Sequence, residues 1–169
     1  NAWHHFFNAV PTSQTQELIA VGGYGRQELH PYSDIDLLIL LPKIASEPQE
    51  RQIEAFIRFL WDIGLEVGHS TRAIKDCIEW ARKDITVVTN LTEARLIEGS
   101  GKLLTRLHEH IRPNKMWSAK KFFAAKREEQ VVRHLRYGDT AYNLEPQIKE
   151  GPGGLRDIQT IQWVGHRYF

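Results

Sequence analysis

The sequence predicts an α+β fold, in which a small mixed sheet with flanking helices is followed by a helical region. Short apolar runs that end at Gly or Pro alternate with amphipathic segments as far as about residue 99. From Lys102 onward the spacing of apolar residues is helical. A chain of 169 residues is long enough for one substantial core. We therefore expect a core domain over residues 1–105 and the start of a helical domain over residues 106–169.

Four segments have the pattern of strands. Residues 17–23 are apolar and stop at paired glycines, and residues 35–41 are apolar and stop before Pro42. Residues 65–73 alternate between two faces, as a strand does. Residues 91–99 have no clear period, but their position between helices and their terminal glycine favour a strand.

The clearest helix spans residues 48–62. Ser46 and Gln49 have the spacing of a capping box, Pro48 suits a first turn, and Gly64 is the expected C-terminal cap. Its apolar positions recur at helical spacing: Ile53, Phe56, Ile57, Leu60 and Trp61. Further helices or helix ends are expected at residues 3–10, 74–81, 103–111, about 115–137, and from 155 to the last residue.

Composition limits the classes of function. Hydrophobic content is 41% and charged content 25%, both ordinary for a globular protein, and no apolar run approaches the roughly 20 residues of a membrane helix. Residues 1–101 carry nine Lys and Arg against 14 Asp and Glu, whereas residues 102–169 carry 13 against seven. An acidic half beside a basic half suits a metal site that faces a phosphate-binding surface, or simply a solvated basic helix. The overall charge of +1 lacks the strongly basic character expected of a nucleic-acid binder.

The chain begins at Asn1 without a visible secretory signal, so we expect it to be a fragment whose last helix continues in a longer protein. Its one cysteine, Cys77, excludes internal disulfides and is compatible with a reducing cytoplasm. We expect Cys77 to be a small core residue. His4, His5, His108 and His110 are expected to be structural or surface residues.

Asp34 and Asp36 raise the main question, because both lie in a segment otherwise suited to burial. An ionised carboxylate in apolar surroundings is costly unless it is paired or bound to a metal. Residues i and i+2 of a strand point to the same face, so these two side chains should project together. Hard cations such as Mg²⁺ prefer carboxylate and phosphate oxygens, and two ions can activate an attacking oxygen and stabilise a leaving one.

Gly22 and Gly23 precede this pair. Paired glycines permit a sharp turn whose backbone N–H groups can bind phosphate oxygens. Arg26 and Ser33 lie in the same loop and are candidates to contact a triphosphate. The dinucleotide-binding glycine pattern does not fit, because Glu28 stands where it needs glycine, and no G-x-x-x-x-G-K-[ST] segment occurs.

The segment "VGGYGRQELHPYSDIDLLIL" resembles the motif of the nucleotidyltransferase superfamily related to DNA polymerase β. Together with "NLEPQIKEGPGGLRDIQTIQWV", it resembles the PII uridylyltransferase/uridylyl-removing family. The resemblance implies a polymerase β-like core and a helical domain that packs on the active-site cleft. It also implies a cytoplasmic nitrogen-regulation enzyme that transfers UMP from UTP to a tyrosine of the PII signal protein and releases pyrophosphate.

The resemblance also implies residue roles. Gly22 and Gly23 would hold the nucleotide phosphates, and Asp34 and Asp36 would bind Mg²⁺. The superfamily uses a third carboxylate, for which "EARLIEG" favours Glu93 as a metal ligand or proton acceptor. The rival candidates are Glu66 and Asp84, and a surface role for Glu93 also remains open.

In the second motif, Lys149 is a candidate phosphate contact, and Arg156 and Asp157 begin the last helix, whose N-terminus favours anions. A structural turn with a surface lysine is the alternative. The family's phosphohydrolase and glutamine-sensing domains have no counterpart in this length of chain. Two other functions stay open: an adenylyltransferase acting on glutamine synthetase, and a nucleotide-binding module without catalysis.

Overall fold

A computed structural model describes residues 2–7, 16–140, 145 and 147–169. The chain divides into two units, Asn1–His110 and Ile111–Phe169. The boundary expected after residue 105 falls within helix α6 (Lys102–Ile111). The helix or helix end expected at residues 3–10 lies partly outside the described residues.

The first unit is built on a four-stranded sheet in the order β3-β2-β1-β4. Strand β2 runs parallel to β3, and β1 is antiparallel to both β2 and β4, so the sheet is mixed, as predicted. The strands are β1 (Glu17–Ala20), β2 (Ile35–Leu41), β3 (Val67–Ala73) and β4 (Arg95–Glu98). The predicted α+β class is confirmed.

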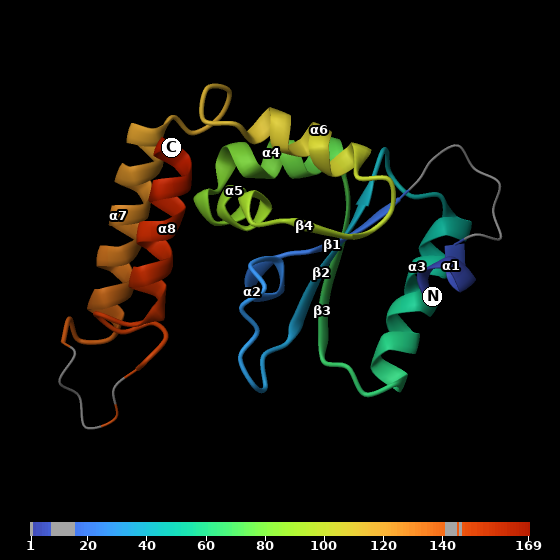
Figure 1. Ribbon diagram of the computed structural model, residues 1–169, viewed down its shortest axis with the longest axis horizontal. Helices are drawn as coiled ribbons and strands as arrows, with labels where there is room; N and C mark the ends of the chain where they lie inside the picture. Colours follow the sequence, from blue (N-terminus) through green and yellow to red (C-terminus); the bar gives the residue numbers. More distant parts are fainter. Residues whose placement is uncertain (1, 8–15, 141–144, 146) are drawn as a thin grey trace. The chain divides into compact units, whose positions relative to one another are not determined.

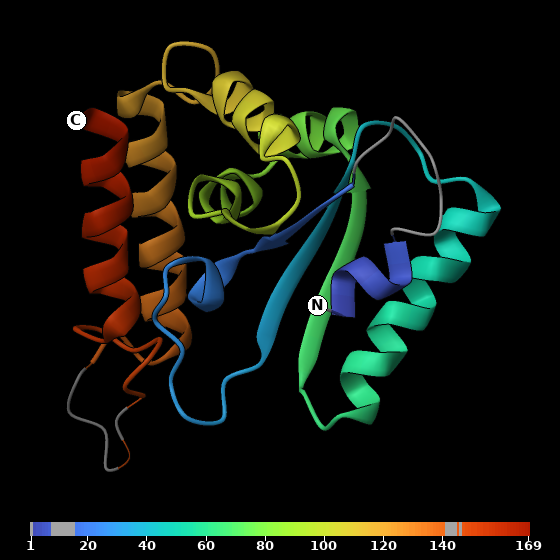
Figure 2. The same ribbon diagram turned by 45° about the vertical axis from the view of Figure 1, so that its right-hand side comes forward.

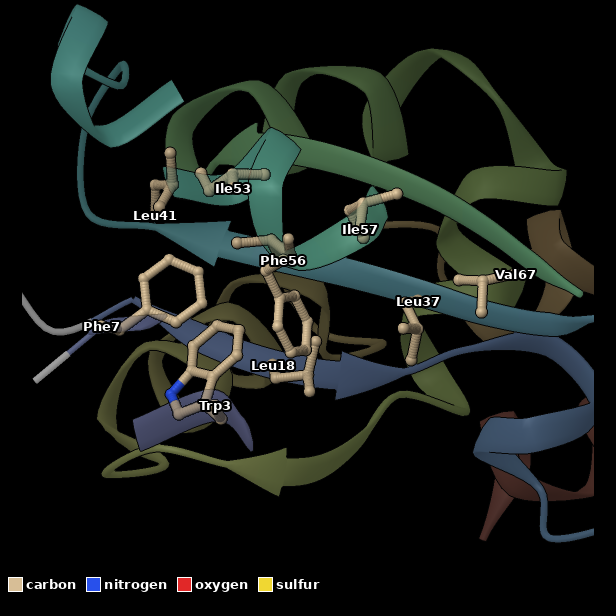
Figure 3. Close-up of a cluster of buried hydrophobic side chains, with 10 residues drawn as sticks. Trp3, Phe7, Leu18, Leu37, Leu41, Ile53, Phe56, Ile57 and Val67 are labelled. Atoms are coloured by element: carbon tan, nitrogen blue, oxygen red, sulfur yellow. The ribbon is translucent and has the colours of Figure 1, made fainter. Parts of the chain in front are cut away.

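Helices lie on both sides of this sheet (Figures 1 and 2). Helices α1 (Ala2–Phe7) and α3 (Glu47–Asp62) lie on one side, and α4 (Ile74–Lys83), α5 (Ile85–Thr92) and α6 on the other. The core under α3 joins the aromatic rings of Trp3, Phe7 and Phe56 to inward-facing strand residues (Figure 3). Those strand residues are Leu18, Leu37, Ile39, Leu41 and Val67.

Three local predictions need correction. Helix α3 begins as expected, but Ser46 makes no side-chain cap, and Gln49 instead donates to Gln16 Oε1 at 3.3 Å. The strand expected at residues 91–99 is shorter, because residues 91 and 92 end helix α5, which was not predicted, and β4 begins only at Arg95. Asp84 caps this helix by accepting a hydrogen bond from Thr86 N. Residues 22–25 form one helical turn, α2 (Gly22–Gly25), rather than the end of a strand.

A fully buried carboxylate joins the central strand to α6. Glu17 accepts hydrogen bonds from the backbone N–H groups of Leu103 and Leu104 and from Ser100 Oγ, at 2.9–3.0 Å. The first N–H groups of a helix have no partner within the helix, and they favour negative charge. Glu17 therefore supplies the N-terminal cap of α6 from a distant strand.

In its described residues, the second unit contains the helices α7 (Ala119–Arg136) and α8 (Leu155–Tyr168). Helix α7 begins later than the predicted residue 115. The buried Lys126 ammonium lies 4.4 Å from the centre of the Trp163 ring and donates to Glu129. These contacts join the two helices through a buried cation on an aromatic face.

Asp157 anchors the turn before α8. Its carboxylate accepts hydrogen bonds from Arg133 at 2.6 Å, from Gln130 at 2.9 Å and from Gly153 N at 2.8 Å, and it lies 3.0 Å from His134 Nε2. Burial alone would raise the pKa of Asp157, but these hydrogen bonds outweigh it and hold the pKa well below its usual range. Asp157 therefore stays ionised and fixes the Gly-rich turn against α7.

No helix within the described ranges is long and apolar enough to cross a membrane.

Candidate active site

The carboxylates of Asp34 and Asp36 lie on the same side of the sheet. Asp34 precedes β2, Asp36 is its second residue, and Gly68 is the neighbour of Asp36 on β3. A β-carbon added at Gly68 would stand 2.9 Å from Asp36 Oδ1 and 3.7 Å from Asp34 Oδ2. The expectation that the two side chains project together is confirmed. Asp34 is exposed and Asp36 is half-buried, so a solute can reach the pair.

A second glycine borders Asp36 on its other side. Gly22, at the start of α2, has φ +58°, and a β-carbon there would stand 2.8 Å from Asp36 Oδ2. That φ and that distance both favour glycine. Val21 N, just before α2, donates to Asp36 O at 3.1 Å and holds the glycine turn beside the strand. The carboxylate of Asp36 thus sits between Gly22 of α2 and Gly68 of β3.

The glycine turn is fixed to the segment that joins α5 to β4. A β-carbon at Gly25 would stand 2.5 Å from Glu93 O, so only glycine allows this approach of the two backbones. Arg26 Nη1 donates to Glu93 Oε2 at 2.7 Å, with both side chains mostly buried. Arg95 Nη2 donates to Tyr24 O at 3.0 Å, and its guanidinium lies over the Tyr24 ring.

The structure separates the candidates for a third carboxylate. Glu93 is paired with Arg26, and Asp84 caps α5. The β2–β3 register pairs Asp36 with Gly68, and Ile35 N donates to Glu66 O at 2.8 Å. The backbone of Glu66, the residue before β3, therefore lies beside that of Ile35, the residue between the two aspartates. Across the part of the chain that the structure describes, no group of three or more His, Cys, Asp or Glu side chains is gathered as a metal site.

The structure places the other predicted site residues, Ser33, Gly23 and Lys149, as follows. Ser33 is exposed in the loop before Asp34, and Ser33 N donates to His30 O. Gly23 follows Gly22 within α2. Lys149 is exposed and belongs to the second unit, so its contact with phosphate stays a prediction.

The histidines have structural contacts. His108 Nε2 lies 3.1 Å from Leu91 O, and burial lowers the pKa of His108. His110 Nδ1 lies 2.8 Å from Arg106 O within its own helix, and His4 Nε2 lies 3.6 Å from Glu98. Cys77 is buried, and desolvation raises its pKa to about 11, so the thiol stays protonated at neutral pH.

Sequence reasoning missed Gly68 and Arg95. An isolated glycine inside a strand marks a close approach of neighbouring atoms, and Gly68 is such a residue within "EVGHSTR". Arg95 gave no comparable signal, because its partner Tyr24 is remote in sequence.

Comparison with known proteins identifies the family to which the chain belongs. A family model described as "Nucleotidyltransferase domain" matches residues 7–96. The chain belongs to the nucleotidyltransferase domain family. The match contains the glycine turn and both aspartates of the site, and it ends within β4. A second model, described as "GlnD PII-uridylyltransferase", matches residues 121–169 of this nucleotidyltransferase chain.

Curated relatives are similar over nearly the whole chain. A bifunctional uridylyltransferase/uridylyl-removing enzyme of Ectopseudomonas mendocina is 57% identical over 99% of this chain and 18% of the relative. The proteins of the same name from Nitrosococcus oceani and Photobacterium profundum are 55% identical over 90% and 52% identical over 99% of this chain. The chain covers 17% and 19% of those two proteins, so it spans less than a fifth of these relatives.

Among solved structures, one described as "Crystal structure of the toxin-antitoxin with AMP-PNP" is 14% identical. It aligns with 82% of this chain and 95% of its own, with a TM-score of 0.40.

Proposed function

We propose that this nucleotidyltransferase chain transfers UMP from UTP to a tyrosine of the PII signal protein in the cytoplasm. The observation that carries the proposal is the convergence of the Asp34 and Asp36 carboxylates at Gly68, beside the turn that begins at Gly22. The similarity to uridylyltransferases over 90–99% of the chain supports the choice of UTP. The relatives are much longer, so uridylyl removal and glutamine sensing are assigned to regions outside these residues.

The donor set suits hard divalent cations such as Mg²⁺. Two carboxylates lie near Gly68, and the neighbours of Asp36 on either side, Gly22 and Gly68, carry no side chains. Carboxylate and phosphate oxygens are the ligands that Mg²⁺ prefers. When bound there, Mg²⁺ would neutralise charge on the triphosphate and on the attacking oxygen.

The chain's own residues position the reactants. The backbone N–H groups of Gly22 and Gly23 and the hydroxyl of Ser33 are proposed to bind phosphate oxygens. The tyrosine oxygen forms a bond to the α-phosphorus, the bond to the bridging oxygen breaks, and pyrophosphate leaves. The phenolic proton passes to a carboxylate of the site, and catalysis rests mainly on alignment and charge neutralisation.

We further propose that Glu66, rather than Glu93, supplies the third carboxylate. Glu66 precedes β3, accepts a backbone hydrogen bond from Ile35 N and is exposed, whereas Glu93 is mostly buried against Arg26. Under this proposal Arg26 and Glu93 hold the glycine turn in place, and Arg26 does not grip the triphosphate directly. Replacing Glu66 by Gln should then lower Mg²⁺-dependent transfer without changing thermal stability.

Isothermal titration of UTP, with and without Mg²⁺, tests the function. Wild-type chain should bind UTP in a Mg²⁺-dependent way, and the double variant Asp34→Asn/Asp36→Asn should lose that dependence. Asp62→Asn, which changes an exposed carboxylate at the end of α3, is the matched control. Equal binding by wild type and double variant would indicate a binding module without catalysis. Tighter binding of ATP than of UTP would favour an adenylyltransferase.

A further inference from the structure

Strand β3 is the outer strand of the sheet, next to the candidate active site. In its parallel pairing with β2, Ile35 N donates to Glu66 O, so the backbone groups of the even-numbered residues of β3 face β2. The backbone N–H and C=O groups of His69 and Thr71, which are odd-numbered, therefore point away from β2, toward the outer edge. Trp61 Nε1 donates to Val67 O at 3.1 Å, which agrees with this alternation. An outer strand with outward-facing N–H and C=O groups can pair with an extended segment of another protein.

A cleft of about 540 Å³ lies along this edge. Its floor includes residues 69–73 of β3, and its walls come from the start of α3 and the start of α4. Three carboxylates line it, those of Glu50, Glu54 and Asp76, against the single guanidinium of Arg72. The cleft therefore favours a segment that carries basic side chains.

The edge also leads to the carboxylate pair. Gly68 is the neighbour of Asp36 on β3 and has no side chain. At this position, therefore, no side chain of β3 separates Asp36 from a strand added to the outer edge. An added strand would lie about 4.8 Å beyond β3. Side chains on neighbouring strands that are offset diagonally lie about 7–8 Å apart, which aromatic residues can span. A tyrosine opposite Gly68 can thus pass over this glycine toward Asp34 and Asp36.

We propose that the acceptor protein docks by adding an extended, basic segment to the outer edge of β3, with its tyrosine opposite Gly68. This inference rests on the proposed function for the identity of the acceptor. It explains why a glycine occupies a strand position beside the catalytic carboxylates. The acceptor's side chains on the α3 side enter the acidic cleft, and its backbone pairs with His69 and Thr71.

Amide hydrogen exchange tests the docking directly, with PII protein as the probe. Adding PII should slow exchange at the amides of His69 and Thr71. The amide of Ser70 faces β2 and should be slow with or without PII, which makes it an internal control. Unchanged exchange at His69 and Thr71 overturns the proposal. Because exchange reports pairing and not UMP transfer, this result stands even if the chain transfers no UMP.

A single proline substitution in β3 adds a functional test. Thr71→Pro removes an outward N–H group, a change that an edge strand tolerates. The KM for PII should rise at least tenfold, with UTP binding unchanged, whereas Thr71→Val keeps the N–H group and should behave like wild type. An unchanged KM for PII in Thr71→Pro overturns the edge proposal and leaves the proposed function intact. Loss of Mg²⁺-dependent UTP binding by wild type would instead overturn the proposed function.

Charge reversal in the cleft tests the basic character of the segment. Glu50→Lys/Glu54→Lys should weaken PII binding at least tenfold at low salt, and the difference from wild type should shrink as salt rises. Asp62→Lys, on the same helix but outside the cleft lining, is the control. Tighter binding by the double variant would contradict a basic partner.

Discussion

Gly68 and Asp36 are partners on neighbouring parallel strands, and a β-carbon on Gly68 would stand 2.9 Å from Asp36 Oδ1. Such an approach is shorter than van der Waals contact allows, so an added methyl group must displace the carboxylate. The position of the Asp36 carboxylate therefore depends on glycine at residue 68, as it does on glycine at residue 22.

Gly68→Ala should lower UMP transfer at least tenfold, about 1.4 kcal/mol of transition-state stabilisation. The reason is that the added methyl group must displace the carboxylate of Asp36 from its place in the site. Stability should stay the same or rise by about 0.5 kcal/mol, because alanine loses less conformational freedom than glycine on folding. Single-turnover rates and thermal melting measure the two effects.

The control for this substitution is Gly165→Ala. Gly165 lies within α8 with nothing within 4 Å of an added β-carbon. It should keep full transfer activity and gain about 0.5–1 kcal/mol of stability from helix propensity. A Gly68→Ala variant as active as this control would contradict the role given to Gly68.

The Arg26–Glu93 pair distinguishes two roles for Glu93. If Glu93 acts through Arg26, then Arg26→Gln, Glu93→Gln and the double variant should each lose transfer activity by a similar factor. A coupling of about 1–3 kcal/mol is expected for contacting residues. Steady-state kinetics and urea unfolding of the wild type, the two single variants and the double variant complete the double-mutant cycle. A much larger loss of kcat in Glu93→Gln than in Arg26→Gln would instead favour Glu93 as a metal ligand.

Glu17 should be essential to stability. Replacing it by Ala leaves Ser100 Oγ and the N–H groups of Leu103 and Leu104 without their acceptor in a buried site. We expect a loss of about 2–4 kcal/mol in the free energy of unfolding. Urea unfolding followed by circular dichroism measures it. Glu98→Ala, a change at the end of strand β4, should cost less than half as much.

Asp157 should make stability depend on acid pH. Its pKa is depressed in the folded state, so its stabilisation is fully present above the ordinary aspartate pKa and is lost as pH falls below that value. The melting-temperature difference between wild type and Asp157→Asn should therefore shrink between pH 5 and pH 3. Calorimetry over this range measures it, with Asp62→Asn, a change at an exposed carboxylate of α3, as the comparison variant. A difference that grows toward pH 3 would contradict the depressed pKa.

Much of the fold followed from the sequence because apolar runs bounded by Gly and Pro mark strands directly. Strand β2 and helix α3 match their predicted ranges within one residue. Helix α5 could not be predicted, because its β-branched residues favour strands and only the Asp84 cap and tertiary packing make it helical. The predicted capping box does not form: Gln49 donates instead to Gln16, which lies 33 residues earlier in the sequence.

The carboxylate pair was predictable because the i, i+2 relation is local. The contacts that fix the glycine turn were not, since Arg26 and Glu93 are separated by 67 residues and Arg95 and Tyr24 by 71. Local patterns identify which side chains share a face. They carry no information on which remote side chains meet, so the pairing of Glu93 with Arg26 did not follow from the sequence.

The cap that Glu17 gives to α6 also has a consequence during synthesis. Its amide donors follow it by 86 and 87 residues. At a translation rate of roughly 5–20 residues per second, the nascent chain waits about 4–17 s for them. Throughout that interval the carboxylate of Glu17 lacks the hydrogen-bond donors that it needs once it is buried, so we expect the sheet to close around β1 only after α6 has been synthesised.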